Sequence, residues 1–166
     1  MNYTKKIFSV IAVLSLLVVG WSGAFSPSIA KSQKGMKKPP DFQTMVPSKY
    51  GFNDTVDMLK AAIEGENLMV IKEINAQKML RMVGVQAKGM KQILFFHPRF
   101  MKRIMKINKH ATIEPPLKIA VMEKPNGKVM VKYIKQTYIF SRYEGMEKVG
   151  VELDSLLAKI VKSVQK

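Results

Sequence analysis

The chain has 166 residues, of which 47% are hydrophobic and 24% are charged. This length fits one domain with a tail and excludes a large multidomain protein, while the composition excludes a wholly disordered or collagen-like chain. The 28 Lys and Arg residues outnumber the 12 Asp and Glu residues, and the resulting net charge of +16 predicts an anionic partner. Because cysteine is absent, disulfides, thiolate metal ligands, a lipid-bearing cysteine and a cysteine nucleophile are excluded.

The first thirty residues have the layout of an export signal. A basic start precedes an apolar run over residues 7–19, and Ala30 ends a group of small residues of the kind that signal peptidase cleaves. An uncleaved membrane anchor is the alternative, because residues 7–25 are long enough to cross a bilayer about 30 Å thick. Residues 1–30 are therefore expected to be a signal peptide or an anchor, with the rest of the chain periplasmic or facing outward from the inner membrane.

Residues 31–41 are expected to form a basic linker. They hold four lysines, Gly35 and a pair of prolines, with hardly an apolar side chain. A solvated spacer explains this composition, and a segment held near anionic lipid headgroups is the alternative. One folded domain is expected over residues 42–166.

Within this domain, strand and helix patterns alternate. Residues 44–48 can form a short strand, which Pro47 would place at the edge of a sheet. Residues 54–64 have apolar side chains at helical spacing and end at Gly65. By the same criteria, strands are predicted over 68–74, 92–96, 117–123 and 128–134, and helices over 76–83, 98–108 and 149–164. Residues 137–141 are expected either to extend the sheet or to begin a turn.

Two dipeptides mark connections between these elements. Asn126-Gly127 lies between two alternating segments and predicts a β-hairpin. Pro115-Pro116 predicts an extended stretch, because a residue before proline avoids helical conformation.

Several of these segments together resemble a known family. They are the strand end at Ser48, the helix start Gly51-Phe52-Asn53-Asp54-Thr55-Val56, residues 68–75, Leu94-Phe95-Phe96-His97-Pro98, Glu114-Pro115-Pro116-Leu117-Lys118-Ile119 and Asn126-Gly127-Lys128-Val129. In this order they are similar to the family called domain of unknown function 302, over residues 45–164. The resemblance implies an α+β fold in which helices pack on a curved antiparallel sheet, a TATA-binding-protein-like arrangement, and a homodimer. It implies no particular activity.

The segment that begins at Pro98 predicts an amphipathic, basic helix. Between positions 72 and 109, ten Lys and Arg residues accompany Glu73 alone, which indicates either a docking face or a generally basic surface. The candidate binding residues are Arg99, Lys102, Arg103, Lys106 and Lys109. Nucleic acid is a disfavoured partner, because an exported protein seldom meets it and neither aromatic RNA-binding motifs nor glycine-rich phosphate loops are present.

His97 is the candidate catalytic residue. It lies between a predicted strand and a predicted helix, whose first N–H groups can hold an anion that Arg99 would also attract. The alternative is that His97 makes only a local hydrogen bond. An enzyme is the less favoured class, because the sequence has no nucleophile motif around serine and no paired carboxylates at strand ends.

No metal or cofactor is predicted. His110 and Glu114, together with His97, suggest zinc or copper, but Pro115 opposes the helix that would place His110 and Glu114 on one face. The thirteen methionines suggest Cu(I) as an alternative, although flexible filling of the core explains them better.

The sequence therefore predicts a small exported protein whose role is binding or interaction. A basic helix, or a cleft between the sheet and the helices, would engage an anionic or amphipathic partner. Residues 7–25 could add an association with the membrane. The alternative function is a small envelope hydrolase or transferase centred on His97 and Arg99.

Overall fold

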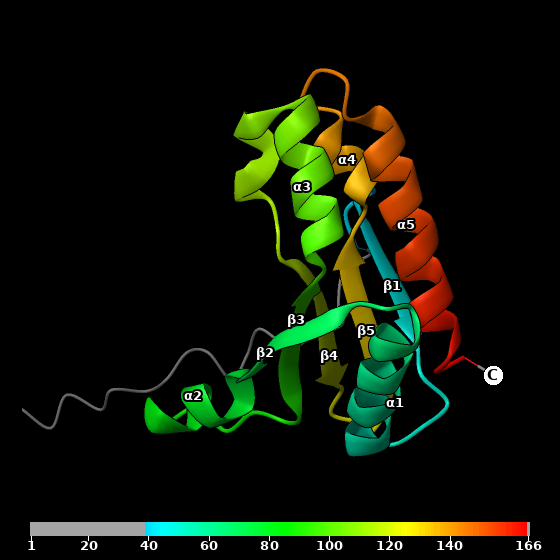
Figure 1. The fold of residues 1–166 in the computed structure, drawn as a ribbon. Helices are drawn as coiled ribbons and strands as arrows, with labels where there is room; N and C mark the ends of the chain where they lie inside the picture. The colour runs from blue at the N-terminus through cyan, green and yellow to red at the C-terminus, as the bar shows by residue number, and fades with distance from the viewer. Residues whose placement is uncertain (1–38, 166) are drawn as a thin grey trace, which may run out of the picture. The chain divides into compact units, whose positions relative to one another are not determined.

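The computed structural model describes residues 39–165. Its five strands form one antiparallel sheet in the order β1-β5-β4-β3-β2, which places β1 and β2 at the edges (Figure 1). The strands are β1 (Gln43–Pro47), β2 (Met69–Asn75), β3 (Met90–Phe96), β4 (Leu117–Glu123) and β5 (Val129–Ile134). The predicted edge position of the Pro47 strand is confirmed, as is the α+β class with helices packed on a curved antiparallel sheet.

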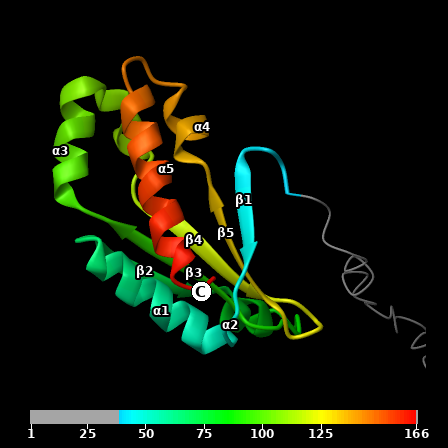
Figure 2. The same ribbon diagram turned by 90° about the vertical axis from the view of Figure 1, so that its right-hand side faces the viewer.

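Helices occupy one side of this sheet and both of its ends. They are α1 (Phe52–Gly65), α2 (Ala76–Met82), α3 (Pro98–Ile107), α4 (Gln136–Phe140) and α5 (Glu147–Lys162), with the 3₁₀ helix η2 (Lys109–Ile113) after α3. Figure 2 shows α1 and α5 in front of the same face of the sheet. The expectation for residues 137–141 is wrong, because these residues lie in or next to α4.

The sheet face beneath α1 and α5 forms the core. Ile93 lies opposite Ile119, and Val121 lies opposite Val131, and all four side chains are fully buried. Leu59 and Ile63 of α1, with Leu153 and Leu157 of α5, supply buried side chains from the helices. Because successive strand residues point to opposite faces, the alternate residues of each strand must lie on the other side of the sheet.

Two local features shape the strands. The predicted hairpin is present: Gly127 has a φ of +78°, and its N–H donates to the carbonyl of Lys124 at 2.9 Å. In β2 the register shifts between Val70 and Lys72, so Ile71 is an extra residue that has no partner in β3. Such a bulge bends and twists the strand that carries it.

Some predictions lie outside the described residues. These are the signal peptide or anchor of residues 1–30 and most of the basic linker. Among residues 39–165, no helix is long and apolar enough to span a bilayer.

Candidate functional site

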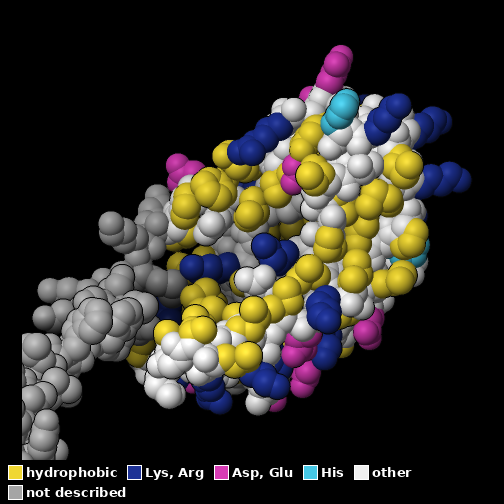
Figure 3. Space-filling view, turned by 90° about the vertical axis from the view of Figure 1, so that its left-hand side faces the viewer, with side chains coloured by type: hydrophobic (Ala, Val, Ile, Leu, Met, Phe, Trp, Pro, Cys, Tyr) yellow, Lys and Arg dark blue, Asp and Glu magenta, His cyan; other side chains and the backbone are white. Residues whose placement is uncertain are grey.

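The sheet face opposite α1 and α5 is called the open face. Its side chains come from all five strands and are mostly half-buried. The central residues of the open face are Met45, Lys72, Ile74, Met90, Gln92, Leu94, Lys118, Ala120, Met122, Met130, Lys132 and Ile134. Figure 3 shows this face as a hollow, bordered by hydrophobic side chains and containing Lys or Arg side chains.

A row of methionines crosses one end of the open face. Met130 of β5 lies opposite Met122 of β4, which in turn lies opposite Met90 of β3. Residues directly opposite in antiparallel strands have Cβ atoms about 5 Å apart, so their side chains are neighbours. Unbranched, polarizable thioethers adapt to ligands of varied shape. This row can therefore form an adaptable apolar floor.

Polar side chains occupy the next rows. Lys132 lies opposite both Met45 and Ala120, and Ala120 lies opposite Gln92. Because alanine is short, it leaves space beside the half-buried Lys132 side chain. Leu94, two residues beyond Gln92 on β3, lies between two further lysines, Lys118 of β4 and Lys72 of β2. Ammonium groups thus alternate with apolar side chains across the face.

All the charged side chains at these central positions are lysines. Lys72, Lys118 and Lys132 make no ion pair with any residue in the described part of the chain. Lys132 is half-buried, whereas Lys72 and Lys118 are exposed. The half-buried Lys132 ammonium group gains most from a bound anion, because it has given up part of its hydration. The open face is therefore an amphipathic surface suited to a negative group.

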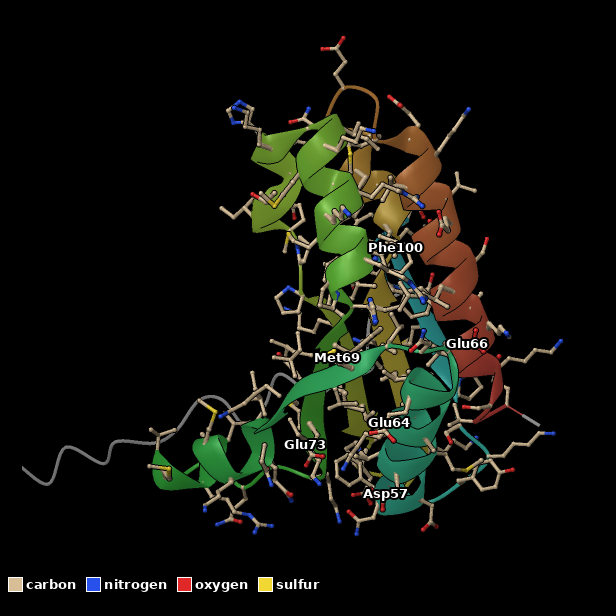
Figure 4. All side chains as sticks on the ribbon, viewed as in Figure 1. Asp57, Glu64, Glu66, Met69, Glu73 and Phe100 are labelled. Atoms are coloured by element: carbon tan, nitrogen blue, oxygen red, sulfur yellow. The ribbon has the colours of Figure 1, made fainter. Side chains whose placement is uncertain are left out.

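The helix-covered face is charged differently. Glu73 accepts from Lys91 at 2.8 Å and from Lys60 at 3.4 Å. The Lys91 hydrogen bond holds the pKa of Glu73 below its ordinary value, and both lysines act in the same direction electrostatically. Asp57 and Glu64 lie on α1, on the side of the molecule away from α2 (Figure 4). Ion pairing therefore compensates the cations nearest α1.

The structure gives His97 a local role at the start of α3. His97 is the N-cap residue, and its Nδ1 accepts from the backbone N–H of Arg99 at 3.0 Å. This bond satisfies one of the N–H groups that the first helical turn leaves without a partner. Within residues 39–165, His97 makes no hydrogen bond to a carboxylate that could orient it as a base.

The predicted basic helix divides into two groups of residues. Arg103 forms an ion pair with Glu152 of α5, and Arg99 donates to the carbonyl of Glu66 at 3.5 Å. Both guanidinium groups also lie over the ring of Phe100, at 5.1 Å for Arg99 and 5.7 Å for Arg103. The contacts to Glu152 and Glu66 join α3 to α5 and to the end of α1, whereas the contacts to Phe100 stay within α3. The second group, Lys102, Lys106 and Lys109, is exposed and makes no ion pair with a described residue.

The residues considered for a metal are separated. Glu114 accepts a hydrogen bond from the Tyr143 hydroxyl, which raises the pKa of Tyr143. His110 is exposed on η2. The part of the chain that the structure describes holds no group of three or more His, Asp or Glu residues able to bind a metal ion.

A groove of about 420 Å³ lies elsewhere, between the C-terminal ends of α1 and α5. Lys159 reaches the carboxylate of Glu66 there at 2.7 Å, so these two charges are already paired. The groove is consequently less suited to an anion than the open face.

The sequence-based interpretation missed Lys118 and Lys132, and it counted Lys72 only within the basic stretch of residues 72–109. Their signal is present in the alternation of the strand segments. Each lysine occupies a position at which the alternating pattern predicts a side chain that faces away from the core. The view of methionine as core filler fits four of the described methionines: Met130 and Met146 are buried, and Met58 and Met101 pack against the core. It is wrong for the other described methionines.

The family described as Domain of unknown function DUF302 matches residues 44–164. No curated protein matches the chain. A crystal structure of an uncharacterized conserved DUF302 protein from Bacillus stearothermophilus is similar, with a TM-score of 0.70 and 18% identity. The match covers 75% of this chain and 99% of that one. Since the family match extends over most of the sequence, this chain belongs to the DUF302 family.

Proposed function

We propose that the protein binds an anionic amphipathic molecule on the open face. The negative head would lie among Lys132, Lys118 and Gln92, and the apolar part would cover the row of Met90, Met122 and Met130. The observation that carries this proposal is the half-buried Lys132, which lies between Met45 and Ala120 and has no acidic partner among the described residues.

The expected binding energy has two sources. A hydrogen bond that involves a charged group contributes about 1.5–3 kcal/mol. Apolar surface contributes about 25 cal/mol for each Å² removed from water, so the methionine row adds to affinity in proportion to the length of the apolar part. Affinity should therefore rise with the length of an alkyl chain attached to the same anionic head.

A second copy of the chain is a less suitable occupant of this face. Two open faces in contact would bring lysines toward lysines, and like charges in direct apposition oppose association. An anion instead neutralises them. The homodimer implied by the family resemblance stays a prediction, and it is compatible with a surface other than the open face.

The test is calorimetric titration of residues 39–166 with dodecyl phosphate, below the concentration at which the lipid forms micelles. The matched variants are Lys132→Glu and Lys128→Glu, because Lys128 is exposed in the β4–β5 turn and the charge change is identical. Lys132→Glu should weaken binding about tenfold or more, which corresponds to about 1.4 kcal/mol, and Lys128→Glu should leave it nearly unchanged.

Two results would overturn the proposal. Equal effects of the two variants would mean that net charge alone attracts the probe. The second result is a dimer, measured by light scattering, that dissociates in proportion to the dodecyl phosphate bound. It would mean that a second copy of the chain occupies the open face.

Export is a second part of the proposal. The basic start, the apolar run and the small residues before position 31 support delivery across the inner membrane. Native mass spectrometry of protein recovered from the cell envelope would distinguish a chain that begins at residue 31 from an intact, anchored chain. Recovery of the full chain from the cytosol would contradict export.

A further inference from the structure

Exposed apolar side chains mark α2, at one end of the open face. Met79, Met82 and Val83 are 59%, 79% and 73% exposed, and none of the residues of α2 is buried. Their spacing of three and four residues gathers them on one side of the helix. A soluble surface seldom places several large apolar residues together without a partner. We call these three residues, with Lys78 and Arg81, the α2 tip.

The α2 tip is held in place by contacts on its other sides. Asn75 caps α2 by accepting from the backbone N–H of Lys78 at 2.8 Å. Gln77 donates to the carbonyl of Ala87 at 2.9 Å, which ties the helix to the chain that returns to β3. The exposed apolar side is therefore presented by a fixed helix.

A second exposed apolar residue lies at the other end. Ile113 of η2 is 80% exposed, and Lys109, four residues earlier in the same helix, is also exposed. Figure 1 shows α2 and the yellow-green η2 projecting from opposite ends of the sheet toward the same side. In Figure 2, which looks onto the helix-covered face, both α2 and η2 lie behind other elements, on the side away from the viewer. The open face lies between these two projections.

The segment of the chain that carries both projections is basic. No acidic residue occurs between Glu73 and Glu114, whereas nine Lys and Arg residues do. Lys91 and Arg103 are already paired with Glu73 and Glu152. The seven that make no ion pair with a described residue are Lys78, Arg81, Lys88, Arg99, Lys102, Lys106 and Lys109. Apolar side chains bordered by cations are the pattern of proteins that lie on anionic bilayers, where the negative headgroups attract nearby Lys and Arg side chains.

We propose that the open face docks on an anionic phospholipid bilayer. The α2 tip would be inserted at the level of the headgroups, and η2 would touch the bilayer surface at the other end. This inference rests on the proposed function and names the source of the bound amphiphile. The open face would then meet the lipid headgroups directly. Docking by the domain differs from any anchoring by residues 7–25, since it requires only residues of the folded part.

The test can use residues 39–166 without the N-terminal segment. The buried core residues of the described part of the chain all lie between Val56 and Val164, and the similar solved chain consists almost entirely of this fold. The single tryptophan of the chain is outside this range, so a new one reports alone. Met82→Trp places the probe on the α2 tip, and Val151→Trp places a matched probe on α5, where Val151 is 57% exposed.

Each variant is mixed with vesicles of phosphatidylglycerol and phosphatidylcholine, or of phosphatidylcholine alone, that contain brominated lipid as a quencher. Met82→Trp should shift its emission to shorter wavelength and be quenched only by the phosphatidylglycerol vesicles, while Val151→Trp should not change. Adding Lys78→Glu and Arg81→Glu to Met82→Trp should weaken vesicle binding about tenfold or more, because two cations become anions.

The two proposals fail in different ways. Unshifted emission of Met82→Trp with phosphatidylglycerol vesicles, while dodecyl phosphate still binds, would overturn docking and leave the proposed function standing. Equal quenching of both tryptophans would also overturn docking, because the bilayer would then show no preference for the open face. If the unmodified domain did not bind dodecyl phosphate, the proposed function itself would be wrong.

Discussion

Lys132 of β5 lies directly opposite Ala120 of β4, on the sheet face that α1 and α5 do not cover. The short alanine side chain keeps the neighbourhood of the ammonium group accessible. Gln92 of β3, the other strand next to β4, also lies opposite Ala120. An apolar environment strengthens an interaction between the ammonium group and an anion, because less water screens it. The size of residue 120 should therefore control access to Lys132.

Replacing Ala120 by phenylalanine tests this relationship. The ring would fill the space beside Lys132, so dodecyl phosphate should bind about tenfold more weakly or worse, a loss of about 1.4 kcal/mol. Ala158→Phe is the control, since Ala158 is exposed on α5. Calorimetry gives the affinities, and thermal unfolding shows whether each variant is folded. Unchanged affinity in a folded Ala120→Phe protein would exclude the space beside Lys132 as the binding position.

His97→Ala should lower the free energy of unfolding by about 1 kcal/mol, because α3 loses its N-terminal cap. His97→Ser should restore most of this loss, since serine can accept from the same backbone N–H group. Urea unfolding measures both. Neither variant should change the binding of dodecyl phosphate. If His97→Ala kept the stability of the natural protein but lost its biological activity, this result would instead support the envelope enzyme centred on His97 and Arg99.

Glu73 should make stability depend on pH. The Lys91 hydrogen bond lowers the pKa of Glu73 in the folded protein, so this carboxylate stabilises the fold above its unfolded pKa. The contribution is lost as pH falls through the lowered, folded pKa. Glu73→Gln should reduce the free energy of unfolding by about 1 kcal/mol at pH 7, and its difference from the natural protein should shrink below about pH 4.

Urea unfolding at a series of pH values measures this difference. Asp57→Asn is the control, because Asp57 is 74% exposed and its oxygen is 3.8 Å from Lys60. It should have almost no effect at any pH. A Glu73→Gln difference that stays constant down to acid pH would contradict the assignment to ion pairing.

Gly150→Ala should destabilise the contact between α4 and α5. A Cβ atom at position 150 would lie 3.0 Å from the Cα of Thr137 and 3.1 Å from the carbonyl oxygen of Gln136. Overpacking of this kind lowers the free energy of unfolding by about 1–3 kcal/mol. Gly65→Ala should be neutral or slightly stabilising, since no atom lies within 4 Å of its new Cβ. Equal stability of the two variants by urea unfolding would refute this packing argument.

The sequence predicted the regular elements well where the information was local. The helical spacing of Val56, Leu59 and Ile63 led to α1, and Asn126-Gly127 led to the hairpin. It failed at residues 137–141, because the cap of α4 is distant along the chain. Asp154 of α5 accepts from the backbone N–H groups of Gln136 and Thr137, at 2.5 and 3.1 Å.

The candidate site was harder to predict for the same physical reason. Alternation along β4 and β5 indicates that Lys118 and Lys132 share a side with apolar residues, but it cannot tell which residues face one another across strands. Only the antiparallel register places Lys132 opposite Ala120, and Ala120 opposite Gln92. The basic residues of α3 were conspicuous in the sequence, yet Arg99 and Arg103 turn out to be engaged with neighbouring elements.

The bulge at Ile71 also affects how copies of this protein meet in concentrated solution. β2 is an outermost strand, whose unpaired N–H and C=O groups could otherwise recruit a strand from another molecule. The extra residue breaks the regular spacing of those groups. At the opposite margin, Pro47 of β1 has no N–H to offer. Both margins are thus protected against polymerisation into extended fibrils.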